Sequence, residues 1–458
     1  MVSFSSLEFL FRFLPIFLIL YFAMPAKYRE IVFLVGSLVF YAVGEPIFIL
    51  VLMVTTLVNY SIGMQIWKLG EGFTVHEWQK SRRKRYMIQV AALDVAVLVI
   101  FKCLAIFVNN TLLPLGISFY IFKMISFQAD LVRGEVWHKP KFKNVALYFI
   151  MFPQVVSGPI MRYHEGEFDL ERNYGLEQFE NGMAYFVAGL GMKVLLADRL
   201  AILWNDLQMI GFQSISTPLA WLGAFGYSGQ LYFDFWGYSL MASGILVMLG
   251  YDFIENFHHP YASKSISEFY RRWHMTLGSW FRDYVYIPIG GSRCGRTKLI
   301  LNLAIVWLLT GIWHGNGINY VIWGAVLGLL IILEKLFYGK FLKKIPVLGN
   351  VYILLLIPLT WVVFAITDIK QLGIYFGRLF PFLGGAGLAV NQLDIIKYLH
   401  SYGPYFVAGI LLCIPAVFQF FEKHKKNPIV VLFLVVVFWA SIYFLSSSAG
   451  NPFMYLDF

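Results

Sequence analysis

The sequence predicts an all-α protein that spans a membrane many times, and two observations support this fold class. Hydrophobic residues make up 59% of the 458 residues and charged residues only 14%, whereas soluble globular chains carry about 25% charged residues. Apolar runs close to the roughly 20 residues needed to cross a bilayer recur along the chain. The hydropathy pattern therefore predicts a polytopic protein with roughly 10–13 spanning or half-spanning helices.

The candidate spans follow one another without an intervening linker or low-complexity segment, so we expect a single membrane domain over residues 1–458. We interpret the first apolar run as a retained span, because no basic residues precede it and residues 24–27 make a poor signal-peptidase site. The three cysteines are scattered and predict neither a disulfide framework nor a metal site. The apolar runs cover residues 9–24, 31–41, 47–66, 86–108, 112–127, 183–203, 240–251, 299–313, 320–336, 351–366, 405–421 and 429–445.

The net charge of +10 indicates orientation in the membrane. Clusters of Lys and Arg mark cytoplasmic loops by the positive-inside rule. Segments that fall outside by alternation carry no Lys or Arg, so both termini of this cell-membrane protein are expected to be extracytoplasmic. Juxtamembrane charge accounts for the basic clusters, so no nucleic-acid partner is expected. The basic clusters are residues 80–85, 139–143, 264–298, 335–344 and 423–426, and the outer segments without Lys or Arg include 44–46, 109–110 and 384–394.

Residues 264–287 depart from plain hydropathy because charged residues interrupt the apolar pattern. The segment begins with Ser265-x-x-Glu268, which is the spacing of a helix-capping box. Glu268 lies three and four residues before Arg271 and Arg272, the spacing at which side chains pair on a helix. The pattern predicts one helix over these residues.

Helical spacing places His274, Gly278 and Phe281 on one face of this expected helix, with Arg282 close by. A helix with so many charges cannot face lipid along its whole length. We therefore expect it to be re-entrant or interfacial and buried against protein, where broken helices can line a polar cavity. A proline–glycine turn at residues 288–291 is expected to end it.

About 15 apolar residues, 299–313, separate a basic loop from His314. At 1.5 Å per residue they rise roughly 22 Å, which is short of the roughly 30 Å hydrocarbon core. His314 is therefore expected to stop inside the membrane, toward its outer side. Residues 315–317, Gly-Asn-Gly, are expected to break the helix there.

His274 and His314 are the candidate catalytic residues. A histidine within a span is costly to bury and marks a substrate or proton path. Its pKa near neutrality suits acyl transfer, because imidazole can take a proton from a hydroxyl nucleophile. One histidine can act as base while the other orients the acyl donor or polarises its carbonyl group. The structural alternative is that each imidazole only hydrogen-bonds a buried carbonyl group.

A zinc site built from these two residues with His258 and His259 is a weaker interpretation. No carboxylate or thiolate accompanies the four histidines at ligand spacing, so no metal is expected. His258 and His259 precede Pro260 at a loop and are expected to be structural.

Two further apolar segments carry polar groups that can line a tunnel. Asp234 lies among aromatic residues at 227–239, and residues 152–162 combine two prolines with Gln, Ser and Arg162. Asp234 can equally be a counter-ion for Arg162 or Arg282.

The glycine-rich turn that follows residue 288 carries basic residues, among them Arg293. Basic side chains on such a turn suit the phosphates of a CoA donor. A positive-inside loop explains the same residues, and the two interpretations stay open.

Taken together, these segments resemble the membrane-bound O-acyltransferase (MBOAT) family, and within it the alginate O-acetylation branch. The resemblance covers essentially the whole chain, and its motifs are jointly specific. They are residues 114–120 (PLGISFY), 152–159 (FPQVVSGP), 232–238 (YFDFWGY), 272–288 (RWHMTLGSWFRDYVYIP), 290–293 (GGSR), 313–315 (WHG) and 451–458 (NPFMYLDF).

The resemblance implies a ring of helices around a thinned centre with a tunnel. His314 matches the family's essential histidine and His274 its second functional position. Asp234, Trp313, Arg282 and Arg293 are then candidates for tunnel or donor-site support. No bound cofactor is implied; the acyl donor is expected to be acetyl-CoA or an acyl carrier on the cytoplasmic side.

The resemblance also implies a partner and a product. The partner is an extracytoplasmic acetyltransferase of the serine-hydrolase-like type, and the product is an O-acetylated exported polysaccharide, as in alginate or exopolysaccharide biosynthesis. Two alternatives remain: D-alanyl transfer to teichoic acid, and a transporter or channel with intramembrane histidines. Inverted repeats would favour a transporter, and the sequence shows no convincing repeat.

Overall fold

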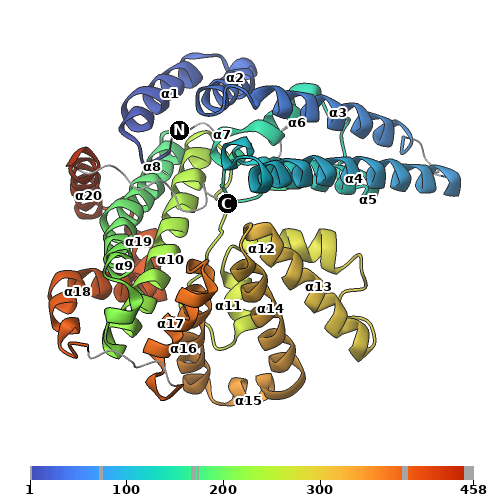
Figure 1. The fold of residues 1–458 in the computed structure, drawn as a ribbon. Helices are drawn as coiled ribbons and strands as arrows, with labels where there is room; N and C mark the ends of the chain where they lie inside the picture. Colours follow the sequence, from blue (N-terminus) through green and yellow to red (C-terminus); the bar gives the residue numbers. More distant parts are fainter. Residues whose placement is uncertain (1–2, 72–75, 167–171, 173–174, 384–389, 448–458) are drawn as a thin grey trace. The chain divides into compact units, whose positions relative to one another are not determined.

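The computed structural model describes residues 3–71, 76–166, 172, 175–383 and 390–447 (Figure 1). These residues form helices joined by short loops, with no strand among them, which confirms the all-α prediction. The closing stretch 451–458 lies outside the described residues. The chain divides into two compact units, Met1–Met183 with Ala242–Ile254 and Ala184–Met241 with Glu255–Phe458, called here the first and second unit.

The first unit is a set of packed helices in which glycines allow close approach. Gly116 and Gly134 flank α5 in left-handed conformations, with φ of 70° and 78°. A Cβ atom at Gly116 would lie 1.9 Å from the carbonyl oxygen of Val155, so only glycine fits there. The helices of this unit are α1 (Leu14–Ala23), α2 (Ala26–Gly44), α3 (Ile49–Lys68), α4 (Glu77–Phe107), α5 (Ile117–Arg133), α6 (Phe142–Ile150) and α7 (Phe152–Val155), and α8 (Leu176–Gly191) begins in it.

The second unit holds both candidate catalytic histidines. Its α13 and α14 cross closely at small residues: a Cβ atom at Gly311 would lie 2.5 Å from the carbonyl oxygen of Tyr320, and one at Gly324 2.5 Å from that of Trp307. Its helices are α9 (Asp198–Ile210), α10 (Thr217–Met248, which ends in the first unit), α11 (Ile266–Arg272), α12 (Met275–Phe281), α13 (Arg296–His314), α14 (Ile318–Leu333), α15 (Gly339–Lys344), α16 (Pro346–Ala365), α17 (Ile369–Leu379), α18 (Asp394–Cys413), α19 (Pro415–His424) and α20 (Pro428–Ser447).

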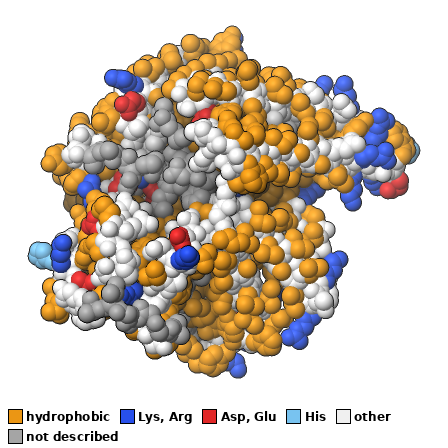
Figure 2. All heavy atoms as spheres, viewed as in Figure 1, with side chains coloured by type: hydrophobic (Ala, Val, Ile, Leu, Met, Phe, Trp, Pro, Cys, Tyr) orange, Lys and Arg blue, Asp and Glu red, His pale blue; other side chains and the backbone are white. Residues whose placement is uncertain are grey.

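Eight of the described helices are long and apolar enough to cross a membrane, or nine if α18 and α19, bent by 74° at their junction, form one span. A shorter apolar helix covers Phe9–Ala23. α20 buries only 11% of its most apolar window, so most of its side chains are available to lipid. Hydrophobic side chains cover much of the surface in Figure 2. The chain is therefore a multi-pass membrane protein.

Hydropathy misplaced one span. The sequence suggested an apolar run at 240–251, but α10 is a single helix over Thr217–Met248 that includes Asp234. Its most apolar window is entirely buried inside the protein. The polar and aromatic side chains before residue 240 therefore face protein and not lipid. For this reason a hydropathy scale based on lipid exposure placed the start of the span at residue 240, well after the true start of the helix.

Candidate functional site

The segment around His274 is two short helices, which corrects the single helix expected over residues 264–287. α11 ends at Arg272 and α12 begins at Met275. Between them His274 has the left-handed conformation (φ 44°, ψ 55°), which is uncommon for a residue with a side chain. His274 therefore precedes α12 as its N-cap residue and does not share a helical face with Gly278 and Phe281.

Hydrogen bonds to a neighbouring segment of backbone stabilise the break between α11 and α12. The His258 N–H donates to the carbonyl oxygen of Arg272 at 2.9 Å, and the Met275 N–H donates to that of Asn256 at 2.9 Å. These bonds satisfy backbone groups on both sides of His274 that a continuous helix would have used. Tertiary pairing thus outweighs the local preference for one helix.

The start of α11 follows the predicted cap only in part. The Ser265 hydroxyl accepts a hydrogen bond from the Glu268 N–H at 3.1 Å, as in a capping box. The Glu268 carboxylate, however, accepts from the Lys264 N–H at 3.0 Å and pairs with Arg272 at 2.7 Å. The predicted Glu268–Arg272 pairing is confirmed.

Buried Glu334 also anchors α11. Its carboxylate accepts hydrogen bonds from the N–H groups of Ile266 at 2.8 Å and Ser267 at 3.3 Å. These are two of the N–H groups that a helix leaves unsatisfied at its start. The contact fixes α11, and with it the break that carries His274.

Glu334→Ala is expected to lower the thermal unfolding temperature of the purified protein in detergent. Hydrogen bonds to a charged group contribute about 1.5–3 kcal/mol, and the variant leaves the buried N–H of Ile266 and the partly buried N–H of Ser267 without their acceptor. Lys335→Ala removes the exposed neighbouring side chain and is the matched control. An unfolding temperature for Glu334→Ala equal to that of the control would contradict this anchoring role.

His274 is enclosed by protein, with 3% of its surface exposed. Its Nδ1 lies 3.1 Å from Asn256 Oδ1, and its ring meets that of Phe235 edge to face at 4.5 Å. His274 lies outside the spanning helices, and burial lowers the pKa of its imidazole to about 3. The ring is therefore neutral near pH 7, as a proton acceptor must be.

His314 is the last residue of α13, and the helix ends before Gly315 as predicted. Its side chain is buried, with 5% exposed. The ring packs against three aromatic rings: Trp313 at 4.7 Å, Trp323 at 5.0 Å and Phe364 at 5.3 Å. This imidazole therefore sits in an aromatic and water-poor setting.

Tryptophan rings connect the surroundings of the two histidines. Trp273, which precedes His274, lies 5.0 Å from Trp361. Trp361 stacks on Trp323 at 5.7 Å, and Trp323 meets His314 at 5.0 Å. We call Trp273, Trp361 and Trp323 the tryptophan cluster. Sequence reasoning did not select Trp323 or Trp361, although their large rings within apolar spans were visible in the sequence.

Asp234 forms a buried ion-pair triad that sequence reasoning missed. The Lys193 ammonium lies 2.8 Å from Asp234 and 2.6 Å from Asp198. Close helix packing makes this possible, since a Cβ atom at Gly237 would lie 2.6 Å from the carbonyl oxygen of Gly189. Asp234 is thus the counter-ion of Lys193, whereas the sequence had suggested Arg162 or Arg282 as its cation.

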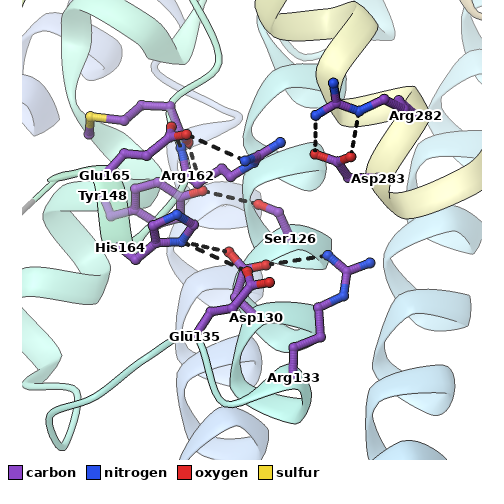
Figure 3. Close-up of polar contacts among 11 residues, drawn as sticks. Ser126, Asp130, Arg133, Glu135, Tyr148, Arg162, His164, Glu165, Arg282 and Asp283 are labelled. Atoms are coloured by element: carbon purple, nitrogen blue, oxygen red, sulfur yellow. Dashed lines mark hydrogen bonds and ion pairs between the residues drawn. The ribbon is translucent and has the colours of Figure 1, made fainter. Parts of the chain in front are cut away.

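The remaining candidates are more exposed. Arg282 pairs with its neighbour Asp283 at 2.7 Å (Figure 3). Arg293 is exposed and lies in the turn after Gly290 and Gly291. That turn is tied to α13, because the Asn302 side chain donates to the Gly291 carbonyl oxygen at 3.1 Å. A role for Arg293 toward donor phosphates stays a prediction.

A second polar cluster lies in the first unit (Figure 3). His164 Nδ1 is 3.7 Å from Asp130 and 3.9 Å from Glu135, and Arg133 is 3.9 Å from Asp130. The hydrogen bond to Asp130 raises the pKa of His164. Asp130, Glu135 and His164 offer ligand atoms within 4.8 Å of one another, a spacing a cation can use, but the Arg133 guanidinium already supplies positive charge beside Asp130. We therefore interpret the cluster as an ion-pair network.

The fold and these buried groups define a polytopic membrane protein with two buried histidines whose surroundings are connected by the tryptophan cluster. Residues 33–374 match the MBOAT, membrane-bound O-acyltransferase family. The chain belongs to this family and is an O-acyltransferase, as the resemblance had led us to expect.

Curated relatives agree with this assignment. "Probable alginate O-acetylase AlgI" of Pseudomonas fluorescens is 38% identical over 386 residues, covering 83% of this chain and 76% of the relative. "Peptidoglycan O-acetyltransferase" of Helicobacter pylori is 29% identical over 419 residues, covering 80% and 78%. "Teichoic acid D-alanyltransferase" of Bacillus subtilis is 28% identical over 248 residues, covering 52% of this chain and 62% of the relative.

Proposed function

We propose that this protein moves acetyl groups from a cytoplasmic thioester donor, acetyl-CoA or an acetylated carrier, across the cell membrane for O-acetylation of an exported polysaccharide. The similarity to alginate O-acetylases extends over 83% of the chain and that to a D-alanyltransferase over only 52%. This difference favours acetyl over D-alanyl as the acyl group.

The observation that carries the proposal is that two histidines at helix ends are buried and that the tryptophan cluster connects their surroundings. A transporter can also use intramembrane histidines, but the family of this chain favours acyl transfer. Burial among rings excludes water, which would otherwise hydrolyse a thioester before the acceptor reached it.

The chemistry assigned to the site is acyl exchange. A hydroxyl oxygen of the acceptor attacks the thioester carbonyl carbon, so a C–O bond forms and the C–S bond breaks. The hydroxyl proton passes to an imidazole nitrogen and then to the leaving thiolate. In this scheme His314 is the base or acyl-relay residue, and His274 supports it.

The proposed site also has supporting groups and partners. Trp313 packs on His314, and Arg293 is proposed to bind donor phosphates on the cytoplasmic side. An extracytoplasmic acetyltransferase of the serine-hydrolase-like type would receive the acetyl group and esterify the polymer. Both chain termini are proposed to be extracytoplasmic.

The test compares native cells with a deletion strain and with the deletion strain complemented by this gene. Mild alkali releases ester-linked acyl groups from the surface polymers, and mass spectrometry identifies them. Loss of acetate from a polysaccharide in the deletion strain, restored by complementation, is expected. Loss of D-alanine would assign the chain to teichoic-acid modification. Unchanged esters, with no paralogue present, would contradict acyl transfer and favour a transporter.

A further inference from the structure

The side chain of Asn256 is held by four hydrogen bonds in the interior of the second unit. Its Oδ1 accepts from the Thr276 N–H at 3.2 Å and the Thr276 hydroxyl at 2.9 Å. The same oxygen lies 3.1 Å from His274 Nδ1, and the Nδ2 group donates to the Ser239 hydroxyl at 3.0 Å. Only 3% of Asn256 is exposed.

One of these bonds determines which way the amide faces. A backbone N–H can only donate, so the Asn256 atom beside the Thr276 N–H must be the oxygen and not the NH₂ group. The backbone of Asn256 is fixed as well, because its carbonyl oxygen accepts from the Met275 N–H at 2.9 Å. The amide therefore cannot turn over to present its NH₂ group to His274.

The amide orientation in turn determines the proton on His274. Asn256 Oδ1 has no hydrogen to donate, so His274 Nδ1 must be the donor in their 3.1 Å contact. A neutral imidazole carries one N–H, and its other nitrogen holds a lone pair. Nε2 is therefore the acceptor nitrogen.

Among the residues that the structure describes, no group uses that lone pair. Nε2 is buried, and no group within the described part of the chain forms a hydrogen bond with it. A buried acceptor without a partner is costly, and a ligand hydroxyl group bound there would supply the missing proton. Phe235 fixes the ring plane edge to face at 4.5 Å, so Nε2 has a defined direction.

We infer that Asn256 is a positioning residue that holds His274 in the Nδ1-protonated tautomer, with Nε2 presented to hydrogen-bond the hydroxyl proton of an acyl acceptor while His314 serves as the base or acyl-relay residue. The inference rests on the proposed function for the identity of the donor of that proton. The tautomer itself follows from the hydrogen bonds of the neutral ring and does not depend on the proposed function. It gives His274 a defined chemical role that its position in the sequence did not reveal.

The tautomer can be measured without any activity assay. The full-length protein in lipid bilayers, labelled with ¹⁵N-histidine, gives distinct solid-state NMR signals for protonated and unprotonated ring nitrogens. A His274→Gln spectrum identifies the signals of His274 by subtraction. Wild type is expected to show Nδ1 protonated and Nε2 unprotonated, and Asn256→Ala is expected to lose this preference. An Nε2-protonated His274 in the wild type, or an unchanged tautomer in Asn256→Ala, would overturn the inference.

Activity is measured in parallel as ester-linked acetate on surface polymers, normalised to the amount of protein in the membrane. Asn256→Ala is expected to lose at least about tenfold, within the roughly 10²–10⁴-fold contribution of general acid–base catalysis. Asn256→Asp keeps an oxygen acceptor for Nδ1 and is expected to recover part of the loss.

Asn350→Ala is the matched control, because the Asn350 side chain also donates to loop backbone, to the carbonyl oxygens of Ala262 and Ser263, and these hydrogen bonds do not involve His274. It is expected to retain activity. Equal losses in Asn350→Ala and Asn256→Ala would reduce Asn256 to a structural role. If wild type shows the expected tautomer but the deletion strain keeps its esters, the proposed function fails and the positioning of His274 stands.

Discussion

A His314→Ala variant is expected to lose ester-linked acyl groups from its surface polymer by at least about 100-fold, since general acid–base catalysis contributes roughly 10²–10⁴-fold. The imidazole is buried against Trp313, Trp323 and Phe364. Little water can reach that position to replace the lost group. The measurement is mild-alkali-releasable acetate per amount of membrane protein in native cells.

The protein should remain folded after this substitution, so that the loss of ester-linked acyl groups can be attributed to the missing imidazole. Removing a buried ring costs stability, so the membrane level of His314→Ala must be quantified, and His314→Gln preserves more of the volume. His400→Ala, at an exposed position on α18, is the matched control and should leave the esters unchanged. Normal acetate from a well-expressed His314→Ala strain without a paralogue would exclude His314 as the catalytic residue.

The position of His314 could be predicted because the signals were local. The apolar run before it, its length and the glycines after it lie within about 20 residues, and α13 ends where they indicate. Most spans were predictable for the same reason, as hydrophobic length is a property of consecutive residues.

The surroundings of His274 and Asp234 could not be predicted, because their partners are distant in sequence. The 264–287 segment has strong local helix signals, and only the backbone pairing with Asn256 and His258 breaks it at His274. Similarly, Lys193 lies on a different helix from Asp234 and reaches it only through close helix packing. Cationic residues in apolar runs carry a signal that can be searched, since a charge buried in a membrane protein requires a partner.

Lys193→Met is expected to destabilise the protein by about 3–5 kcal/mol, the usual cost of removing one partner from a buried ion pair. Lys193 is 2% exposed and its ammonium lies 2.6 Å from Asp198 and 2.8 Å from Asp234, so its loss removes the cation that both carboxylates share. Thermal unfolding in detergent and the amount of protein in the membrane measure the effect. Lys80→Met, which breaks an exposed pair with Glu77, is the control and should change stability by less than about 1 kcal/mol.

A charge-free version of the triad separates its structural role from a chemical one. In Lys193→Met/Asp198→Asn/Asp234→Asn no buried charge is left without a partner, so stability should recover relative to Lys193→Met, as it does when a whole buried ion pair is replaced. If the recovered protein also transfers acyl groups, Asp234 serves only as the counter-ion of Lys193. If it is stable but inactive, at least one charged group of the triad is needed for acyl transfer beyond its structural role. Failure of the triple variant to recover any stability would contradict the view that uncompensated charge, and not lost shape, is what Lys193 prevents.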